Sequence, residues 1–231
     1  MNPRDPSVFV RRADVHDADG VMALRERLAF TGSNQGGFLL GTDRAGYLTL
    51  LAGTHAWVLE DRGTVVGVAI VLDDAQFRQS GVFERRNQVQ WTDAHTLERF
   101  IDQRLAYYEQ LGVDRGPYRR WGAVLAFTAL LDAIQTADAV VTTTVRQPVN
   151  NEAAIPYIRK VGGVELGEID EVYPAFGQLL STLWLMESDG VRRRLRDTAR
   201  RGERWIAGQA EQAVGEWRWQ LQNQIRDLPG G

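Results

Sequence analysis

The sequence predicts an α/β domain followed by a helical C-terminal extension, and three stretches carry that prediction. Residues 105–134 are typical of a strand, a tight loop and a helix, because strand formers stop at Asp-Arg-Gly-Pro and apolar positions then recur three or four apart. Residues 55–72 contain two β-rich runs on either side of a short loop with a glycine, which is a hairpin pattern. Residues 164–173 alternate apolar and polar side chains, as a half-exposed strand does.

The remaining elements follow from the same periodicities. Asp14 can cap the helix that follows the first strand. In chain order, we expect a strand at 8–12, helices after Asp14 and at 42–51, the hairpin at 55–72, a strand at 105–113, a helix from 121 to 134, and strands at 138–145, 164–173 and 179–186.

One further helix is expected between the strands at 138–145 and 164–173. Asn150 or Asn151 is the expected cap at its start. Pro156 is expected inside this helix, where it removes a hydrogen bond and bends the axis. The glycine pair at 162–163 should end the helix.

The composition is that of an ordinary globular protein. The 231 residues suffice for one domain with a full core or for one domain plus an appendage, and 44% of them are hydrophobic. A formal net charge of −3 gives no general attraction to nucleic acid or to an anionic membrane. No apolar run approaches the roughly 20 residues that span a bilayer, and the N-terminus lacks the apolar core of a signal peptide. The cytoplasm is therefore the expected location.

Side chains suited to metal binding or covalent catalysis are scarce. The chain has no cysteine, which excludes disulfides, thiolate metal sites and a cysteine nucleophile. The three histidines are scattered, so we expect no histidine-only metal site and no metal cofactor. His55 begins a predicted strand, where a structural role is favoured over a catalytic one.

Residues 189–231 form the predicted extension of a domain that spans residues 1–188. An arginine-rich lead-in at 192–204 precedes apolar positions with helical spacing, among them Trp217 and Leu221. The lead-in is expected to be a connection rather than a core helix. The apolar stripe must cover something, namely the domain's own sheet, the acceptor pocket or a second subunit, and we expect a homodimer in which this helix contributes to the interface. A contact of the arginines with nucleic acid or an acidic partner is the less favoured interpretation.

A phosphate-sized anion site is expected at Arg119–Val124, where the loop after the strand at 105–113 leads into the helix. The first N–H groups of a helix have no intrahelical partner, and together with the helix dipole they favour an anion. The alternative is that Gly116 and Gly122 are ordinary turn glycines beside solvent-exposed arginines.

A second motif lies downstream of the first, and the two motifs together resemble those of a known family. Arg119-x-x-Gly122-x-Val124 is followed by Asn151-x-x-Ala-Ile and then by Lys160-x-Gly162. In this order and spacing, the two stretches resemble the GNAT superfamily of N-acetyltransferases, whose motifs are R/Q-x-x-G-x-G/A and N-x-x-A-I-x-x-Y-x-K-x-G-F. The resemblance covers roughly residues 8–187. It implies a mixed, mostly antiparallel central sheet flanked by helices.

The resemblance also implies a binding site for acetyl-coenzyme A. In the family, a bulge splays the strand before the phosphate loop from its neighbour, and the pantetheine arm pairs with backbone groups at the strand's end. These groups would be Leu111, Gly112 and Val113, with Gly112 as the candidate for the bulge. Asn151 matches the family's asparagine that contacts the arm. The pyrophosphate would rest on Arg119, Arg120, Trp121, Gly122, Ala123 and Val124, although Val124 stands where the family has a small residue.

The implied chemistry is direct transfer of the acyl group to an amine in a ternary complex. Family members draw a carboxylate base from the strand before the phosphate loop, which makes Glu109 the candidate general base. The family's tyrosine acid falls at Ile158, and Tyr157 lies one residue earlier, about 100° round the helix. Either a distortion at Pro156 brings Tyr157 into place, or no tyrosine acts.

Two segments acquire a second interpretation from the resemblance. The Gly/Ser/Asn stretch 31–37 is either a plain connector or a specificity loop beside the acceptor. The polar insert 73–99, with Phe77, Phe83, Trp91 and His95, is either a surface excursion whose aromatics pack on the body or a cover over the acceptor site.

The sequence therefore predicts an acyl-CoA-dependent N-acyltransferase, with acetyl-CoA as co-substrate and a small-molecule primary amine as acceptor. A non-catalytic acyl-CoA-binding regulatory or interaction protein of the same fold is the alternative. Neither a membrane nor a nucleic acid is an expected partner.

Overall fold

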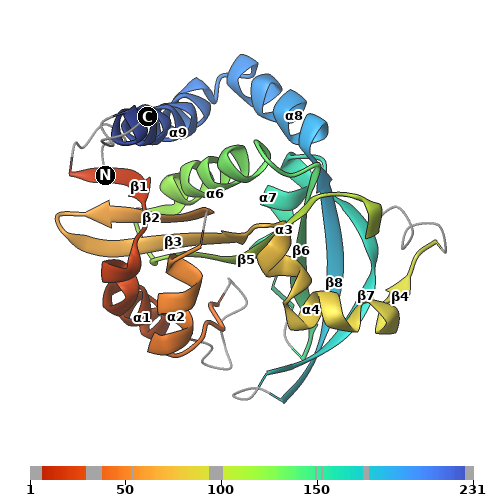
Figure 1. The fold of residues 1–231 in the computed structure, drawn as a ribbon. Coiled ribbons are helices and arrows are strands. Elements are labelled where there is room, and N and C mark those ends of the chain that lie inside the picture. Colours follow the sequence, from red (N-terminus) through yellow and green to blue (C-terminus); the bar gives the residue numbers. More distant parts are fainter. Residues whose placement is uncertain are drawn as a thin grey trace.

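The fold is one eight-stranded sheet with helices on both faces (Figure 1). The computed structural model describes residues 7–29, 38–53, 55–93, 101–148, 150–151, 153–173 and 177–226. The strand order is β1-β2-β3-β5-β6-β8-β7-β4, and every neighbouring pair is antiparallel except β5 and β6, which are parallel. The strands are β1 Val8–Arg12, β2 His55–Asp61, β3 Thr64–Leu72, β4 Gln90–Trp91, β5 Leu105–Val113, β6 Ala139–Gln147, β7 Val164–Tyr173 and β8 Gly177–Glu187.

The helices divide between two hydrophobic clusters on opposite faces of the sheet. One cluster joins the sheet to α6 and α9, and the other joins it to α1, α2 and α3. The helices are α1 Ala18–Arg27, α2 Arg44–Leu51, α3 Asp74–Arg78, α4 Gly81–Glu84, α6 Arg119–Ala133, α7 Ile155–Lys160, α8 Ser188–Arg200 and α9 Arg204–Arg226, with 3-10 turns η1 Val15–Asp17 and η2 Arg85–Gln88. Every predicted strand and helix in the described ranges is present within a few residues.

The predicted hairpin is the pair β2–β3. Its turn residues Arg62 and Gly63 have φ values of 50° and 79°, so both lie in the left-handed region that a tight two-residue hairpin turn requires. Near the N-terminus, Asp14 caps the turn η1 with a reciprocal capping box to Asp17, and α1 follows. The loop 31–37 lies outside the described residues.

The insert 73–93 packs on the body of the domain through its aromatic side chains. Phe77 is fully buried, and its ring stacks on Tyr107 of β5 at 5.0 Å between centroids. Phe83 meets Phe77 edge to face at 5.4 Å. These contacts favour the interpretation of the insert as an excursion anchored to the core. His95 lies outside the described residues.

The expected cap and kink of α7 are corrected by the structure. The N-cap is Ala154 rather than Asn150 or Asn151, and it makes no side-chain capping bond. Pro156 falls in the first turn, where its missing N–H would have no helical partner anyway, so it removes no hydrogen bond of the helix. Gly162 ends the helix as predicted, with a φ of 88°.

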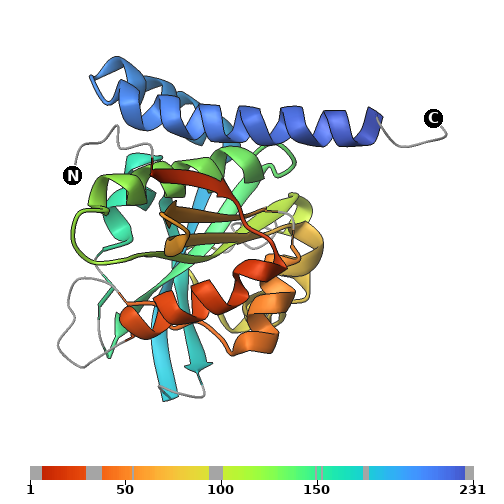
Figure 2. The ribbon, with the colours of Figure 1, turned by 90° about the vertical axis from the view of Figure 1, so that its left-hand side faces the viewer.

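The C-terminal extension covers the domain's own sheet and helix α6. Figure 2 shows α9 lying along the molecule over α6 and β1. The arginine-rich lead-in is the regular helix α8, whose Val191 and Leu195 are buried, so the expectation of a mere connection is wrong. On α9, Trp205 meets Trp121 at 5.0 Å and Trp217 meets Trp57 at 6.1 Å between ring centroids.

A buried ionic cluster supports this packing. The carboxylate of Asp132 on α6 accepts hydrogen bonds from Arg12 at 2.6 Å and from the Trp57 indole at 3.1 Å. His55 lies 2.9 Å from the same oxygen, so its role is structural. The Arg12 guanidinium in turn lies 4.2 Å from the ring centroid of Trp217, which links α9 to the cluster by a cation–π contact.

No helix among the residues that the structure describes is both long enough and apolar enough to cross a membrane.

Candidate active site

The two parallel strands at the centre of the sheet separate along their length. Residues 105–108 of β5 pair with residues 139–142 of β6, and the last pair is Tyr108 with Thr142. Beyond it, β5 continues to Val113 along β3, while β6 continues to Gln147 along β8. One edge of β5 therefore faces a gap, and backbone groups on that edge are left without a strand partner.

A bulge lies at the start of this gap, at Glu109. On β3, Ile70 pairs with Gln110 while Val71 pairs with Tyr108, so Glu109 is the extra residue. Gly112 pairs regularly with Val68, and the expectation of a bulge at Gly112 is wrong. Gly112 instead permits a close approach, since a Cβ there would lie 3.1 Å from Leu28.

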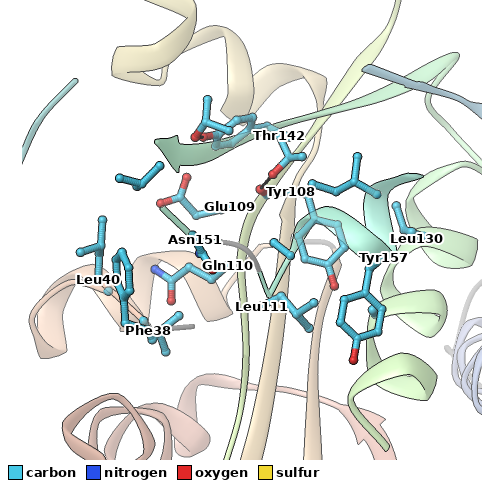
Figure 3. Close-up of a pocket in the computed structure, with 18 of the residues that line it drawn as sticks. Phe38, Leu40, Tyr108, Glu109, Gln110, Leu111, Leu130, Thr142, Asn151 and Tyr157 are labelled. Atoms are coloured by element: carbon cyan, nitrogen blue, oxygen red, sulfur yellow. Dashed lines mark hydrogen bonds between the residues drawn. The ribbon is translucent and has the colours of Figure 1, made fainter. Parts of the chain in front are cut away.

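The bulge interrupts the alternation of side chains along β5, so that two successive residues lie on the same side of the strand. Glu109 and Gln110 extend toward Phe38 and Leu40, as Figure 3 shows. Tyr108 and Leu111 extend the other way, toward Tyr157 and Leu130 (Figure 3). Gln110 is fixed on its side by the hydroxyl of Tyr47, which donates to its Oε1 at 3.2 Å.

These side chains line a pocket that passes through the gap in the sheet. It encloses about 930 Å³, including solvent at its mouth. One half is bounded by residues 38–41 just before α2, and the other by α6 and α7. The described lining residues are Phe38, Leu39, Leu40, Gly41, Tyr107, Tyr108, Glu109, Gln110, Leu111, Ala126, Leu130, Thr142, Thr143, Val145, Asn151, Ala154, Tyr157, Ile158, Glu171 and Met186.

Two carboxylates lie in this wall. Burial raises the pKa of Glu109 to about 7, and the nearby charge of Glu171 adds to the rise. Glu171, on β7, is 3% exposed, and burial also raises its pKa. A carboxyl group that titrates near neutral pH can accept a proton and release it again at physiological pH.

Two tyrosines lie on the opposite side of the pocket. Tyr108 is 8% exposed, and its hydroxyl makes no hydrogen bond with the described residues. Burial raises its pKa above the ordinary value, so the phenol stays protonated. The hydroxyl of Tyr157 lies 3.6 Å from the position that a Cβ on Gly122 would occupy, and so faces the first turns of α6.

The start of α6 is shaped to approach a ligand closely. The N–H of Gly122 donates to the carbonyl of Tyr118 at 3.0 Å, so the helical ladder begins there. The free N–H groups are therefore those of Arg119, Arg120 and Trp121, fewer than the six residues expected. A Cβ on Gly122 would come within 3.2 Å of Val113, which explains the glycine.

Other side chains of the expected phosphate loop face the core. Val124 is fully buried, and its branched side chain packs in the hydrophobic cluster between α6 and the sheet. Trp121 is buried against Trp205, and Ala123 is buried as well. The side chains of Arg119 and Arg120 are exposed, and no described carboxylate pairs with either of them.

Thus the pocket brings together Glu109, Leu111, Asn151 and Tyr157 of the predicted site residues. Gly112, Val113 and the loop 119–124 lie outside its lining. Sequence reasoning missed Tyr108 and Glu171. The alternation along β7 is the pattern that could have indicated Glu171, because Glu171 lies on the same buried face of the strand as Ile169. Val172 lies on the opposite, exposed face. Among the described residues, no group of three or more histidines and carboxylates is arranged to hold a metal ion.

Comparison with solved structures identifies the fold. The chain is similar to agmatine N-acetyltransferase, with 14% identity, a TM-score of 0.54, and coverage of 78% of this chain and 99% of that one. It is similar to the loading GNATL domain of CurA from Lyngbya majuscula, with 12% identity, a TM-score of 0.53, and coverage of 79% and 98%. It is also similar to YncA of Salmonella typhimurium, solved with its cofactor acetyl-CoA, with 17% identity, a TM-score of 0.51, and coverage of 79% and 95%.

No family model matches the sequence, and no curated protein matches it. The similarity in structure shows that the chain has the GNAT fold, a mixed α/β sheet with an added C-terminal helical extension.

Proposed function

We propose that this protein is an acyl-CoA-dependent N-acyltransferase that transfers an acetyl group from acetyl-CoA to a primary amine of a small molecule. The observation that carries the proposal is the separation of β5 from β6 beyond Tyr108 and Thr142, which opens a pocket beside the start of α6. YncA, a protein of the same fold, was solved with acetyl-CoA, and agmatine N-acetyltransferase is named for an amine.

The residues present suit the parts of coenzyme A. The free N–H groups at the start of α6 and the exposed side chains of Arg119 and Arg120 favour a pyrophosphate. The unpaired edge of β5, from Leu111 to Val113, offers backbone groups to the amides of the pantetheine arm. Asn151 lines the pocket beside that edge and supplies an amide. The acyl group then lies near the bulge at Glu109.

The chemistry is an attack of the amine nitrogen on the thioester carbonyl. Glu109 accepts a proton from the amine, which general base catalysis makes about 10²- to 10⁴-fold faster. A backbone N–H on the open edge of β5 stabilises the tetrahedral oxyanion, an effect worth roughly 3 kcal/mol. The carbon–sulfur bond then breaks, and the departing thiolate takes up a proton.

The source of that proton is one of two tyrosines. Tyr157 is the candidate from the family motif, and it lines the pocket. Its hydroxyl, however, lies beside Gly122, at the end of the site that suits phosphate. The thiol of coenzyme A is at the far end of the pantetheine arm from the phosphates. Tyr108 lies at the last β5–β6 pair, has an unbonded hydroxyl and is the better placed donor for the sulfur.

A non-catalytic acyl-CoA-binding protein is the second candidate. Ile158, at the family's tyrosine position, is buried and cannot donate a proton. If neither tyrosine acts, the pocket would bind the thioester without turnover.

Two measurements separate these functions. Titration calorimetry with coenzyme A tests binding, and mass spectrometry of amines incubated with acetyl-CoA tests transfer. Binding with acetylated product supports the enzyme, whereas binding without product from any of a broad set of amines supports the regulator. Absence of binding at millimolar coenzyme A rejects both.

A further inference from the structure

The pocket contains two carboxylates where one general base would suffice. Glu109 comes from the bulge of β5, and Glu171 comes from β7, three strands away in the sheet. Among the described residues that line the pocket, none is a lysine, arginine or histidine. The negative charge of the pair is therefore not balanced within the pocket wall.

The residues around Glu109 and Glu171 do little to balance the negative charge of the pair. Arg85 on η2 is the cation that acts on Glu171, but its guanidinium donates to the backbone carbonyls of Asp170 and Gly81 at 2.8 and 2.9 Å. The effect of burial on the pKa of Glu171 outweighs that of Arg85. The other polar neighbours are neutral: the hydroxyls of Ser181 and Thr143 make polar contacts with Glu171 that lower its pKa, but they carry no charge that would balance it.

The two carboxylates cannot serve the same purpose during transfer. A carboxylate that has taken the proton of the attacking amine is neutral and no longer attracts a cation. Glu109 is partly exposed at the gap in the sheet, whereas Glu171 is 3% exposed. A buried carboxylate is stabilised strongly when a cation pairs with it, because burial leaves it poorly solvated.

On the basis of the proposed function, we infer that the acceptor carries two cationic groups. Its primary amine loses a proton to Glu109 and is acylated, and a second ammonium or guanidinium group stays charged and pairs with Glu171. The side chains of Phe38 and Leu40 add an apolar wall on the side of the pocket toward which Glu109 extends. An aliphatic chain between the two cationic groups suits that wall. The substrate class is thus the aliphatic diamines and amino-guanidines.

The test compares diaminobutane with butylamine, its counterpart with one amine, as acceptors for the wild-type full-length chain. We expect kcat/KM to be at least about tenfold higher for the diamine, because a hydrogen bond to a charged group is worth roughly 1.5 to 3 kcal/mol and 1.4 kcal/mol is tenfold. Equal kcat/KM values for the two amines, or a preference for butylamine, would overturn the inference.

Variants of Glu171 test whether this residue causes the preference for the diamine. Glu171→Gln should raise KM for the diamine until its kcat/KM approaches that of butylamine, and Glu171→Asp should keep part of the preference. An undiminished diamine preference in Glu171→Gln rejects the role of Glu171. Coenzyme A affinity of each variant, measured by calorimetry, reports whether the pocket is folded. If Glu171→Gln does not fold, the wild-type ratio still decides.

Failure of this inference is distinguishable from failure of the proposed function. A chain that binds coenzyme A and acetylates butylamine as well as diaminobutane is an acetyltransferase without the dicationic preference. A chain that does not bind coenzyme A at all fails the proposed function itself.

Discussion

Tyr108 and Thr142 form the last pair between the parallel strands β5 and β6, and the Thr142 hydroxyl also donates to the carbonyl of Tyr108 at 2.9 Å. This hydrogen bond closes the paired segment at the point where the strands separate. The next residue, Glu109, is the bulge of β5. A polar side chain thus fixes where the pocket begins.

The first expectation concerns the start of α6. Gly122→Glu should abolish coenzyme A binding, because it adds bulk and negative charge where the helix favours an anion. Gly215→Glu is the matched control, since a side chain there meets nothing within 4 Å on exposed α9. Calorimetry with coenzyme A measures both variants. Normal binding by a folded Gly122→Glu would place the phosphate site elsewhere.

The second expectation concerns the pH dependence of transfer. Glu109 acts as a base in its ionised form, and its pKa is raised to about 7. The value of kcat/KM should therefore rise with pH through about 7 and then level off. Glu109→Gln should lower kcat/KM by about 10²-fold or more and remove this rise. A wild-type profile that is flat between pH 5 and 8 would argue against Glu109 as the base.

The raised pKa of Glu109 also predicts how stability depends on pH: the free energy of unfolding should fall with rising pH, whereas kcat/KM should rise. A carboxyl group whose pKa is higher in the folded than in the unfolded chain binds its proton more tightly when folded. Its contribution to the free energy of unfolding is then present at low pH and declines as pH rises from its ordinary value of 4.5 through about 7. Glu109→Gln should lose this decline, which denaturant titrations at several pH values would detect.

The third expectation separates the two tyrosines. Tyr108→Phe should lower kcat with little change in coenzyme A affinity, because the hydroxyl has no hydrogen bond to lose within the described residues. Tyr157→Phe should weaken coenzyme A binding more than it lowers kcat, because its hydroxyl faces Gly122. Single-turnover rates and calorimetry measure the two effects. The reverse pattern would restore Tyr157 as the proton donor.

The fourth expectation concerns the attachment of α9. Trp217→Ala should reduce the free energy of unfolding by roughly 2 to 3 kcal/mol, since it removes the contacts with Trp57 and Arg12. Trp219→Ala is the control on the same helix, because Trp219 is 66% exposed and should change stability by less than about 0.5 kcal/mol. Similar losses in both variants would mean that α9 does not depend on this contact.

The fifth expectation is the homodimer, which a single chain does not test. Its remaining basis is the edge of α9 where Trp219 and Leu221 are exposed, since Ala210, Val214 and Trp217 of the stripe pack on the domain. Analytical ultracentrifugation of the full chain should show a dimer, and Trp219→Glu combined with Leu221→Glu should weaken it. A monomeric full chain rejects the dimer. A dimer of unchanged affinity in the double variant moves the interface elsewhere.

The sequence by itself determined the elements and the fold. Periodicity located β5, α6 and the hairpin β2–β3, because apolar spacing and turn glycines act over a few residues. The two short motifs at Arg119 and Asn151 then identified the GNAT fold, and both Glu109 and Tyr157 line the pocket.

Only the tertiary structure decided which residues meet. The bulge falls at Glu109 and not at Gly112 because register is a relation between β5 and β3, which no pattern within β5 contains. Val124 and Trp121 turn to the core because α9 and the sheet cover α6, and the covering helix, Arg204–Arg226, lies far downstream in the sequence. Glu171 joins Glu109 for the same reason: a pocket forms where strands distant in sequence separate, and the chain's local pattern records only which face of its own strand a residue occupies.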